Sequence, residues 1–168
     1  YLKDCKERGG KYEIELGDAR LTLERELQSH QPQHFHVLVL DAFSGDAIPV
    51  HLLTEEAFAT NVEQLAKEAN GDEEGAIAVH ITNRYVDLEP VVLGLAERFK
   101  LGHVLIKNDA GSDGAYSSEW MILSRNPALL KELEAYAEPP AEERTPLGPK
   151  KKPVLWTDGR SNLFDVLK

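Results

Sequence analysis

Residues 35–41 read Phe-His-Val-Leu-Val-Leu-Asp, and this stretch is the strongest indication of the fold. Apart from His36, residues 35–40 are a continuous apolar run with β-branched valines, the pattern of a strand covered on both faces. Strands of this kind belong to parallel sheets that helices cover on each side. We therefore expect an α/β protein in which Asp41 stands at the carboxyl end of a buried strand.

The segments on either side alternate between strand and helix patterns. We expect further strands at residues 12–16, 75–81, 103–106 and 120–124, and helices at residues 21–28, 54–69, 88–99 and 128–136. This alternation predicts a mostly parallel sheet between helices. Only a loop joins the last two strands, so we expect them to form an antiparallel hairpin. Residues 138–155, rich in proline and charge, should form a mobile loop.

The composition is that of an ordinary globular domain. The chain has 168 residues, 42% hydrophobic and 29% charged, and we expect residues 1–168 to form a single domain. No apolar run approaches the roughly 20 residues that span a bilayer, and residues 1–6 are too charged for a secretory signal. We therefore expect a cytoplasmic location. One cysteine, Cys5, excludes a disulfide framework and a cysteine-rich zinc site.

The charge balance bears on the choice of ligand. The chain has 19 Lys and Arg against 29 Asp and Glu, a net charge of -10. This charge disfavours nucleic-acid phosphates and suits a small cationic ligand, although acidity also serves solubility alone. We expect no metal site, because His34 and His36 share one side of a strand without a third ligand at useful spacing.

Two carboxylates occupy the loop that follows the apolar strand. Ligands of parallel α/β sheets bind at the carboxyl ends of strands, where Asp41 and Asp46 are expected. Together they can hold a diamine and accept a proton from one end of it. The alternative is that Asp41 caps a turn and Asp46 is only solvated. His80, at the end of another expected strand, suits a pocket-lining or hydrogen-bonded histidine.

Two further residues are candidates for ligand contact. Asp18 ends an expected strand and can accept a hydrogen bond from an exocyclic amine such as that of adenine. Capping of the following helix is the commoner role for such an aspartate. Tyr116 offers an aromatic face that suits a cation.

Three stretches resemble the spermidine synthase-like (polyamine aminopropyltransferase) family: residues 17–20 (Gly-Asp-Ala-Arg), residues 36–46 (His-Val-Leu-Val-Leu-Asp-Ala-Phe-Ser-Gly-Asp) and residues 78–85 (Ala-Val-His-Ile-Thr-Asn-Arg-Tyr). The likeness is greatest to the bacterial spermidine synthase-like branch, which residues 156–163 also resemble. Some members of that branch carry membrane-spanning segments elsewhere in a longer chain, which would tether such a parent protein to a membrane. The resemblance implies a Rossmann-like S-adenosylmethionine-dependent methyltransferase fold.

The resemblance also implies a reaction. An aminopropyl group passes from decarboxylated S-adenosylmethionine, a co-substrate, to an amine such as putrescine, with no prosthetic group and no metal. Asp41 matches the catalytic aspartate that deprotonates the attacking amine, and Asp18 with Ala19 matches the positions that meet the adenine. Asp46 would bind the acceptor, but it lies further from Asp41 than the family's second aspartate does. Tyr116 lies near the position of an active-site tyrosine.

The sequence departs from the family in what precedes these stretches. The glycine-rich cofactor loop and the ribose-binding acidic residue are not present, and we expect both upstream of Tyr1. In this fold the first two strands lie between the third, here residues 12–16, and the fourth, residues 35–40. We expect residues 1–30 to be re-paired or loosely attached, and the open sheet to favour a homo-oligomer. A small-molecule methyltransferase and a non-catalytic binding module are the alternative functions.

Overall fold

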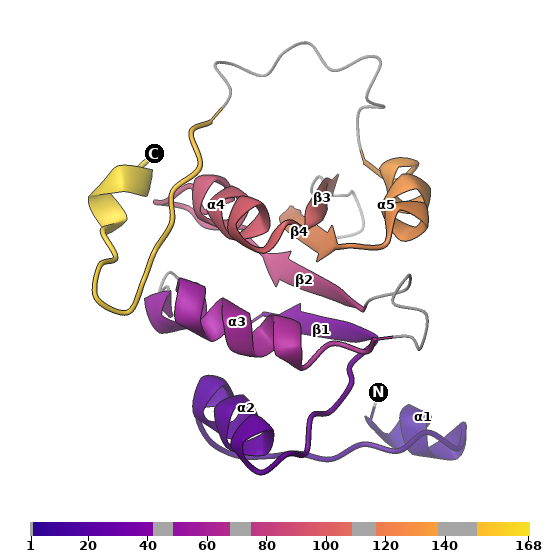
Figure 1. Cartoon of the computed structure of the whole chain (residues 1–168). Helices are drawn as coiled ribbons and strands as arrows, with labels where there is room; N and C mark the ends of the chain where they lie inside the picture. The colour runs from indigo at the N-terminus through magenta and orange to yellow at the C-terminus, as the bar shows by residue number, and fades with distance from the viewer. Residues whose placement is uncertain (1, 42–48, 68–74, 109–116, 138–150) are drawn as a thin grey trace.

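A computed structural model describes residues 2–41, 49–67, 75–108, 117–137 and 151–168 (Figure 1). The chain is α/β, as expected from the apolar run at residues 35–40. The elements are α1 (Leu2–Glu7), α2 (Ala19–Gln28), β1 (Val37–Leu40), η1 (Val50–Leu52), α3 (Glu55–Glu63), β2 (Ala76–His80), α4 (Glu89–Phe99), β3 (Gly102–Asn108), β4 (Ser118–Ser124), α5 (Pro127–Glu134) and η2 (Leu163–Val166).

The strands form one mixed sheet in the order β1-β2-β4-β3. β1 and β2 are parallel, with Val37 opposite Ala76, whereas β4 is antiparallel to both β2 and β3. The expected hairpin of β3 and β4 is confirmed. The expectation of a mostly parallel sheet is wrong for the described strands, because β4 returns directly from β3 and occupies the place beside β2. β1, β2 and β3 nevertheless run in one direction, so their carboxyl ends share one edge.

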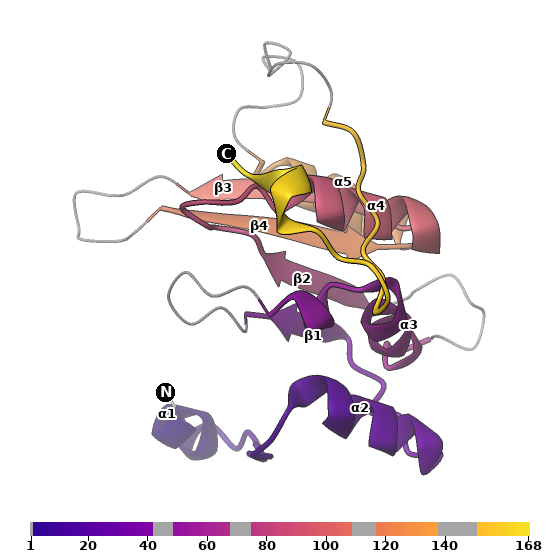
Figure 2. The same cartoon turned by 90° about the vertical axis from the view of Figure 1, so that its left-hand side faces the viewer.

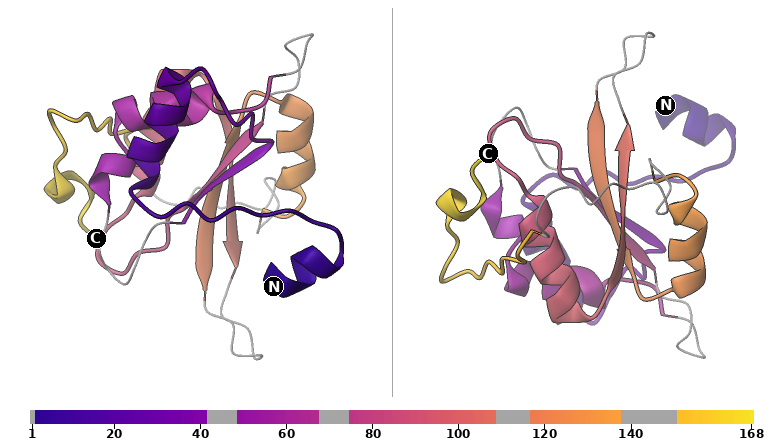
Figure 3. Two further views of the ribbon diagram at one scale, coloured as in Figure 1. Left: turned by 90° about the horizontal axis from the view of Figure 1, so that it is seen from below. Right: turned by 90° about the horizontal axis from the view of Figure 1, so that it is seen from above.

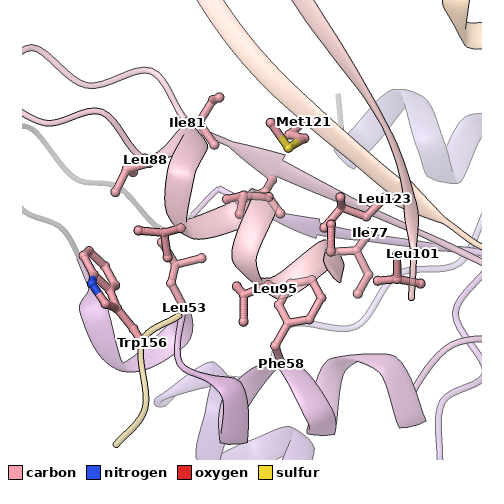
Figure 4. Packing of buried hydrophobic residues seen from close by; sticks show 14 of the residues in the cluster. Leu53, Phe58, Ile77, Ile81, Leu88, Leu95, Leu101, Met121, Leu123 and Trp156 are labelled. Atoms are coloured by element: carbon pink, nitrogen blue, oxygen red, sulfur yellow. The ribbon is translucent and has the colours of Figure 1, made fainter. Parts of the chain in front are cut away.

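Helices cover both faces of this sheet. α3 and α4 lie on one face and α5 on the other, against β3 and β4 (Figure 3). The core lies between the sheet and the α3–α4 layer, where Phe58, Ile77, Leu95 and Met121 pack together (Figure 4). Hydrophobic burial of this kind is the main source of stability.

The C-terminal segment crosses the α3–α4 layer (Figure 2). Trp156 is 1% exposed and belongs to the core, and its carbonyl oxygen accepts a hydrogen bond from the N–H of Glu55. Val154 donates its N–H to the carbonyl oxygen of Pro90. Part of the expected mobile loop, residues 151–155, is therefore attached to α4, and residues 138–150 lie outside the described part of the chain.

The N-terminal part differs from the expectation. Residues 12–16 do not form a strand, and Ile14 and Leu16 are 67% and 92% exposed. An alternating pattern becomes a strand only where a neighbouring strand pairs with its backbone groups. Neither α1 nor α2 has a fully buried residue.

α3 begins as predicted and ends earlier. The Thr54 hydroxyl caps it by accepting a hydrogen bond from the N–H of Ala57. The helix ends at Glu63 because Leu65 forms a parallel bridge with Phe35 at the start of the sheet. Within the described residues, no helix is both long and apolar enough to cross a membrane.

Candidate functional site

The carboxyl edge of β1 and β2 brings Asp41 and His80 together. The parallel register places Leu40 opposite Val79, so the next residue of each strand lies side by side at this edge. His80 Nδ1 is 2.8 Å from Asp41 Oδ1, and the two side chains are 23% and 53% exposed. Asp41 is therefore accessible to a ligand while its orientation is fixed by a neighbour.

Thr82 supports His80 from the other side. Its Oγ1 lies 2.8 Å from His80 Nε2 and accepts a hydrogen bond of 2.6 Å from the backbone N–H of Glu119 in β4. The rings of His80 and Trp120, opposite residues of β2 and β4, stack with centroids 4.6 Å apart. These contacts connect three strands into one network that ends at Asp41.

The network determines the tautomer of a neutral His80. A carboxylate oxygen only accepts hydrogen bonds, so the nitrogen that faces Asp41, Nδ1, carries the hydrogen. Thr82 already accepts the Glu119 N–H and can donate its own hydroxyl hydrogen to Nε2. His80 thus donates to Asp41 and accepts from Thr82.

Asp41 also borders a small cavity between α2, β1 and α3. The cavity has a volume of about 210 Å³, and we call it the Asp41 cavity. Its lining residues are Ala19, Arg20, Leu23, Val39, Leu40, Asp41, Leu52, Ala57 and Asn61. Pockets for drug-sized ligands measure about 300–1,000 Å³, so the space that the described residues enclose suits a small amine better than a whole nucleoside.

Of the two residues predicted to meet adenine, Ala19 and Asp18, one lines this cavity. Ala19 borders it, and Asp18 is the N-cap of α2, where Oδ1 accepts a hydrogen bond of 3.1 Å from the N–H of Leu21. Asp18 Oδ2 lies 3.1 Å from His51 Nε2. The backbone N–H of Leu21, more than His51, lowers the pKa of Asp18. The capping role weighed for Asp18 is present, and contact with adenine stays a prediction.

Arg20, from the same Gly-Asp-Ala-Arg stretch, is occupied by carboxylates. Its guanidinium makes two hydrogen bonds to Asp158, of 2.7 and 2.5 Å, and a third of 2.7 Å to Glu24. The hydrogen bond to Asp158 raises the pKa of Arg20, and the bond from Arg20 lowers the pKa of Asp158 to about 2. Arg20 therefore ties α2 to the C-terminal segment.

Sequence reasoning missed several members of this site. Thr82 lies in the family-like stretch 78–85 but was given no role, and Glu119 and Asn61 carry no local motif; the pairing of distant segments brings all three to the neighbourhood of Asp41. Asp46 and Tyr116, both predicted to contact substrate, lie outside the described residues. In the part of the chain that the structure describes, no group of three or more His, Cys, Asp and Glu side chains could hold a metal ion.

Comparisons with known proteins do not extend this description. No family model, curated protein or solved structure matches the chain significantly.

Proposed function

We propose that the chain is part of a spermidine synthase-like transferase and that Asp41 accepts the proton of the attacking amine. The observation that carries the proposal is the position of this carboxylate: it is half exposed at the carboxyl end of β1, held by His80, and borders a cavity together with Ala19. The three family-like stretches of the sequence contribute to this single place. Ligand sites of open α/β sheets occur at this edge.

The arrangement of the sheet supports the same proposal. The methyltransferase-like Rossmann fold that the resemblance implies has parallel strands and a C-terminal antiparallel hairpin. The described strands have one parallel pair and then β4 inserted between β2 and β3. The coarse α/β architecture is common to many activities, so the site, and not the fold, carries the functional argument.

The proposed reaction asks little of the protein beyond one proton acceptor. Asp41 takes a proton from the acceptor ammonium, which frees the nitrogen lone pair. The nitrogen attacks the aminopropyl carbon that is bound to the sulfonium sulfur. A C–N bond forms as the C–S bond breaks, and the electron pair of the C–S bond stays on sulfur in the neutral thioether methylthioadenosine. The proton then leaves Asp41 for solvent. A positioned base of this kind contributes about 10²–10⁴-fold.

His80 improves Asp41 as a proton acceptor by orienting it. The hydrogen bond from Nδ1 uses one carboxylate oxygen, Oδ1, and leaves Oδ2 for the amine. Among the described residues, Glu119 is a second carboxylate near this network, and it is paired with Lys107 at 2.6 Å. Of these two described carboxylates, Asp41 is therefore the one available to a cationic substrate.

The identity of the nucleoside product tests the proposal. The full-length protein is incubated with decarboxylated S-adenosylmethionine and a panel of primary amines, and in parallel with S-adenosylmethionine. We expect methylthioadenosine and an aminopropylated amine from the first mixture. Release of S-adenosylhomocysteine from the second would instead assign a methyltransferase, and absence of both products with retained amine binding would assign a binding module.

A further inference from the structure

Asn61 is a second polar side chain on the Asp41 cavity. It projects from α3, borders the cavity and is only 5% exposed. Among the described residues its side-chain amide makes no hydrogen bond, and it is not one of the fully enclosed polar groups that lack a partner, so it reaches the open space of the cavity. An amide has two N–H donors and a carbonyl acceptor, and buried amides are almost always hydrogen-bonded. A ligand bound in the cavity can therefore form hydrogen bonds with this amide.

Gln64, on the same helix face as Asn61, shows what a structural amide looks like here. Its Nε2 donates to the carbonyl oxygen of Leu23 at 3.0 Å and to Glu26 at 3.2 Å, and its Oε1 accepts from the N–H of Gln33 at 2.7 Å. Two buried amides thus lie between α3 and α2, and the protein satisfies one of them. The difference is that Asn61 borders the cavity.

The two polar side chains differ in charge and depth. Asp41 is half exposed and carries the charge, whereas Asn61 is buried and neutral. The charge of Arg20, also on the wall, is taken up by Asp158 and Glu24. The rest of the lining is apolar: Ala19, Leu23, Val39, Leu40, Leu52 and Ala57.

We propose that the Asp41 cavity binds an unbranched ω-amino alcohol, with its ammonium at Asp41 and its hydroxyl hydrogen-bonded to the Asn61 amide. This rests on the proposed function and names the class of acceptor amine. The alkyl chain contacts the apolar walls. A diamine fits less well, because its second ammonium would be desolvated beside a neutral amide without a carboxylate.

Calorimetric titration with three kinds of probe tests the proposal. The probes are 4-aminobutan-1-ol with its three- and five-carbon analogues, putrescine, and butylamine, which has no second polar group. We expect the best amino alcohol to bind about tenfold or more tightly than butylamine and putrescine, the value of one good buried hydrogen bond. Putrescine or butylamine binding as tightly as every amino alcohol would overturn the proposal.

Matched variants separate a ligand contact from a structural role. Asn61→Leu should abolish the preference for the amino alcohol over butylamine while the protein stays folded, as thermal unfolding of the same sample checks. Gln64→Leu should lower the stability and keep the preference. A preference unchanged in Asn61→Leu would contradict the role of this amide; if that variant does not fold, Asn61→Ser and the wild-type probe series decide.

A separate measurement distinguishes this proposal from the proposed function. The protein is incubated with decarboxylated S-adenosylmethionine and each probe in turn, and the methylthioadenosine released is quantified. The amino-alcohol preference without product would retain the cavity assignment and reject the transferase. Product without any preference would retain the transferase and reject the cavity assignment.

Discussion

At the scale of single residues, the account depends on the contact between Asp41 and His80. The two residues are 39 positions apart and meet because parallel strands end at one edge. Thr82 and the backbone of Glu119 hold the far side of the imidazole. A carboxylate supported in this way keeps one orientation, which is what a proton acceptor needs.

We predict that neutral His80 is protonated on Nδ1. Long-range ¹H–¹⁵N correlation spectra distinguish the two ring nitrogens, and we expect Nε2 to show the shift of an unprotonated nitrogen that accepts a hydrogen bond. Asp41→Asn offers Nδ1 either a carbonyl oxygen or an N–H and should raise the share of the Nε2–H form. A dominant Nε2–H tautomer in the unchanged protein would contradict the network as described.

Gly94 is the clearest case of a residue that packing requires to be small. It lies inside α4, where alanine would normally favour the helix by up to about 1 kcal/mol. A Cβ at this position would collide with the carbonyl of Val154 in the C-terminal segment. We expect Gly94→Ala to destabilise the protein by about 1–3 kcal/mol, measured by denaturant unfolding.

The control for this substitution is Gly159→Ala, whose added Cβ would meet no atom within 4 Å. Its stability should match that of the unchanged protein. Equal stability of Gly94→Ala and Gly159→Ala would show that the C-terminal segment does not lie against α4 as described.

At the scale of elements, Arg20 and Asp158 hold α2 to the rest of the molecule. α2 has no fully buried residue, yet it packs against α3 and forms one wall of the Asp41 cavity. Arg20 reaches Asp158, and Thr54 Oγ1 donates a hydrogen bond of 2.8 Å to the same carboxylate. The wall of the cavity therefore depends on a contact between two segments that are distant in sequence.

We predict that Arg20→Ala detaches α2. Hydrogen exchange of the α2 amides should become faster, whereas Arg25→Ala, which removes an exposed arginine of the same helix, should leave it unchanged. Equal protection of α2 in the two variants would contradict the role of Arg20.

The contact between Arg20 and Asp158 also predicts a loss of stability at low pH. The pKa of Asp158 is lowered from 3.8 to about 2 because Arg20 hydrogen-bonds to the carboxylate. Because its pKa is lowered on folding, the ionised Asp158 contributes fully to the stability of the folded state above about pH 4, and this contribution is lost as the pH falls toward 2. We expect Asp158→Asn to flatten the pH dependence of α2 protection in this window; an unchanged profile would contradict the assignment.

Most individual elements could be predicted from the sequence, because local patterns decide them. The apolar runs predict β1 and β2, and the helix expected from residue 54 corresponds to α3, with boundaries shifted by a few residues. The insertion of β4 could not be predicted, since strand order depends on packing between distant segments. Residues 12–16 misled because an alternating segment forms a strand only where its backbone pairs with a neighbouring strand, and residues 12–16 do not pair with one.

In the site, too, local patterns predict single residues but not their contacts with distant segments. Asp41 could be located from the strand that precedes it, and His80 was correctly expected to be hydrogen-bonded. The residues that hold the His80 ring could not be named, because Thr82 and Glu119 meet only through the pairing of β2 with β4. Arg20 and Asp158 are separated by 138 positions, and no local pattern relates them.

At the scale of the whole molecule, β1 carries exposed apolar side chains at the end of the sheet. Val37 and Val39, both in β1, are 60% and 53% exposed. Among the described strands, β1 pairs only with β2, so one edge of it is unpaired. Unpaired edges with apolar side chains favour association with another strand.

We predict that the 168-residue chain self-associates through the unpaired edge of β1. Sedimentation velocity should show a concentration-dependent oligomer, and Val37→Lys should shift it toward the monomer because a charge at a strand edge opposes pairing. Phe164→Ser, which removes an 81%-exposed ring in the C-terminal segment, is the control and should leave association unchanged. A monomer at every concentration would exclude association through β1.

The central claim is that Asp41 accepts the proton of an attacking amine at the edge of this sheet. Single-turnover formation of methylthioadenosine in the full-length protein, compared between Asp41→Asn and Asp165→Asn, tests it most directly. Asp165 is an exposed carboxylate whose contact is with Asn162. We predict a fall of about 10²–10⁴-fold for Asp41→Asn with unchanged nucleoside binding, and no change for Asp165→Asn. Equal rates in the two variants would contradict the account.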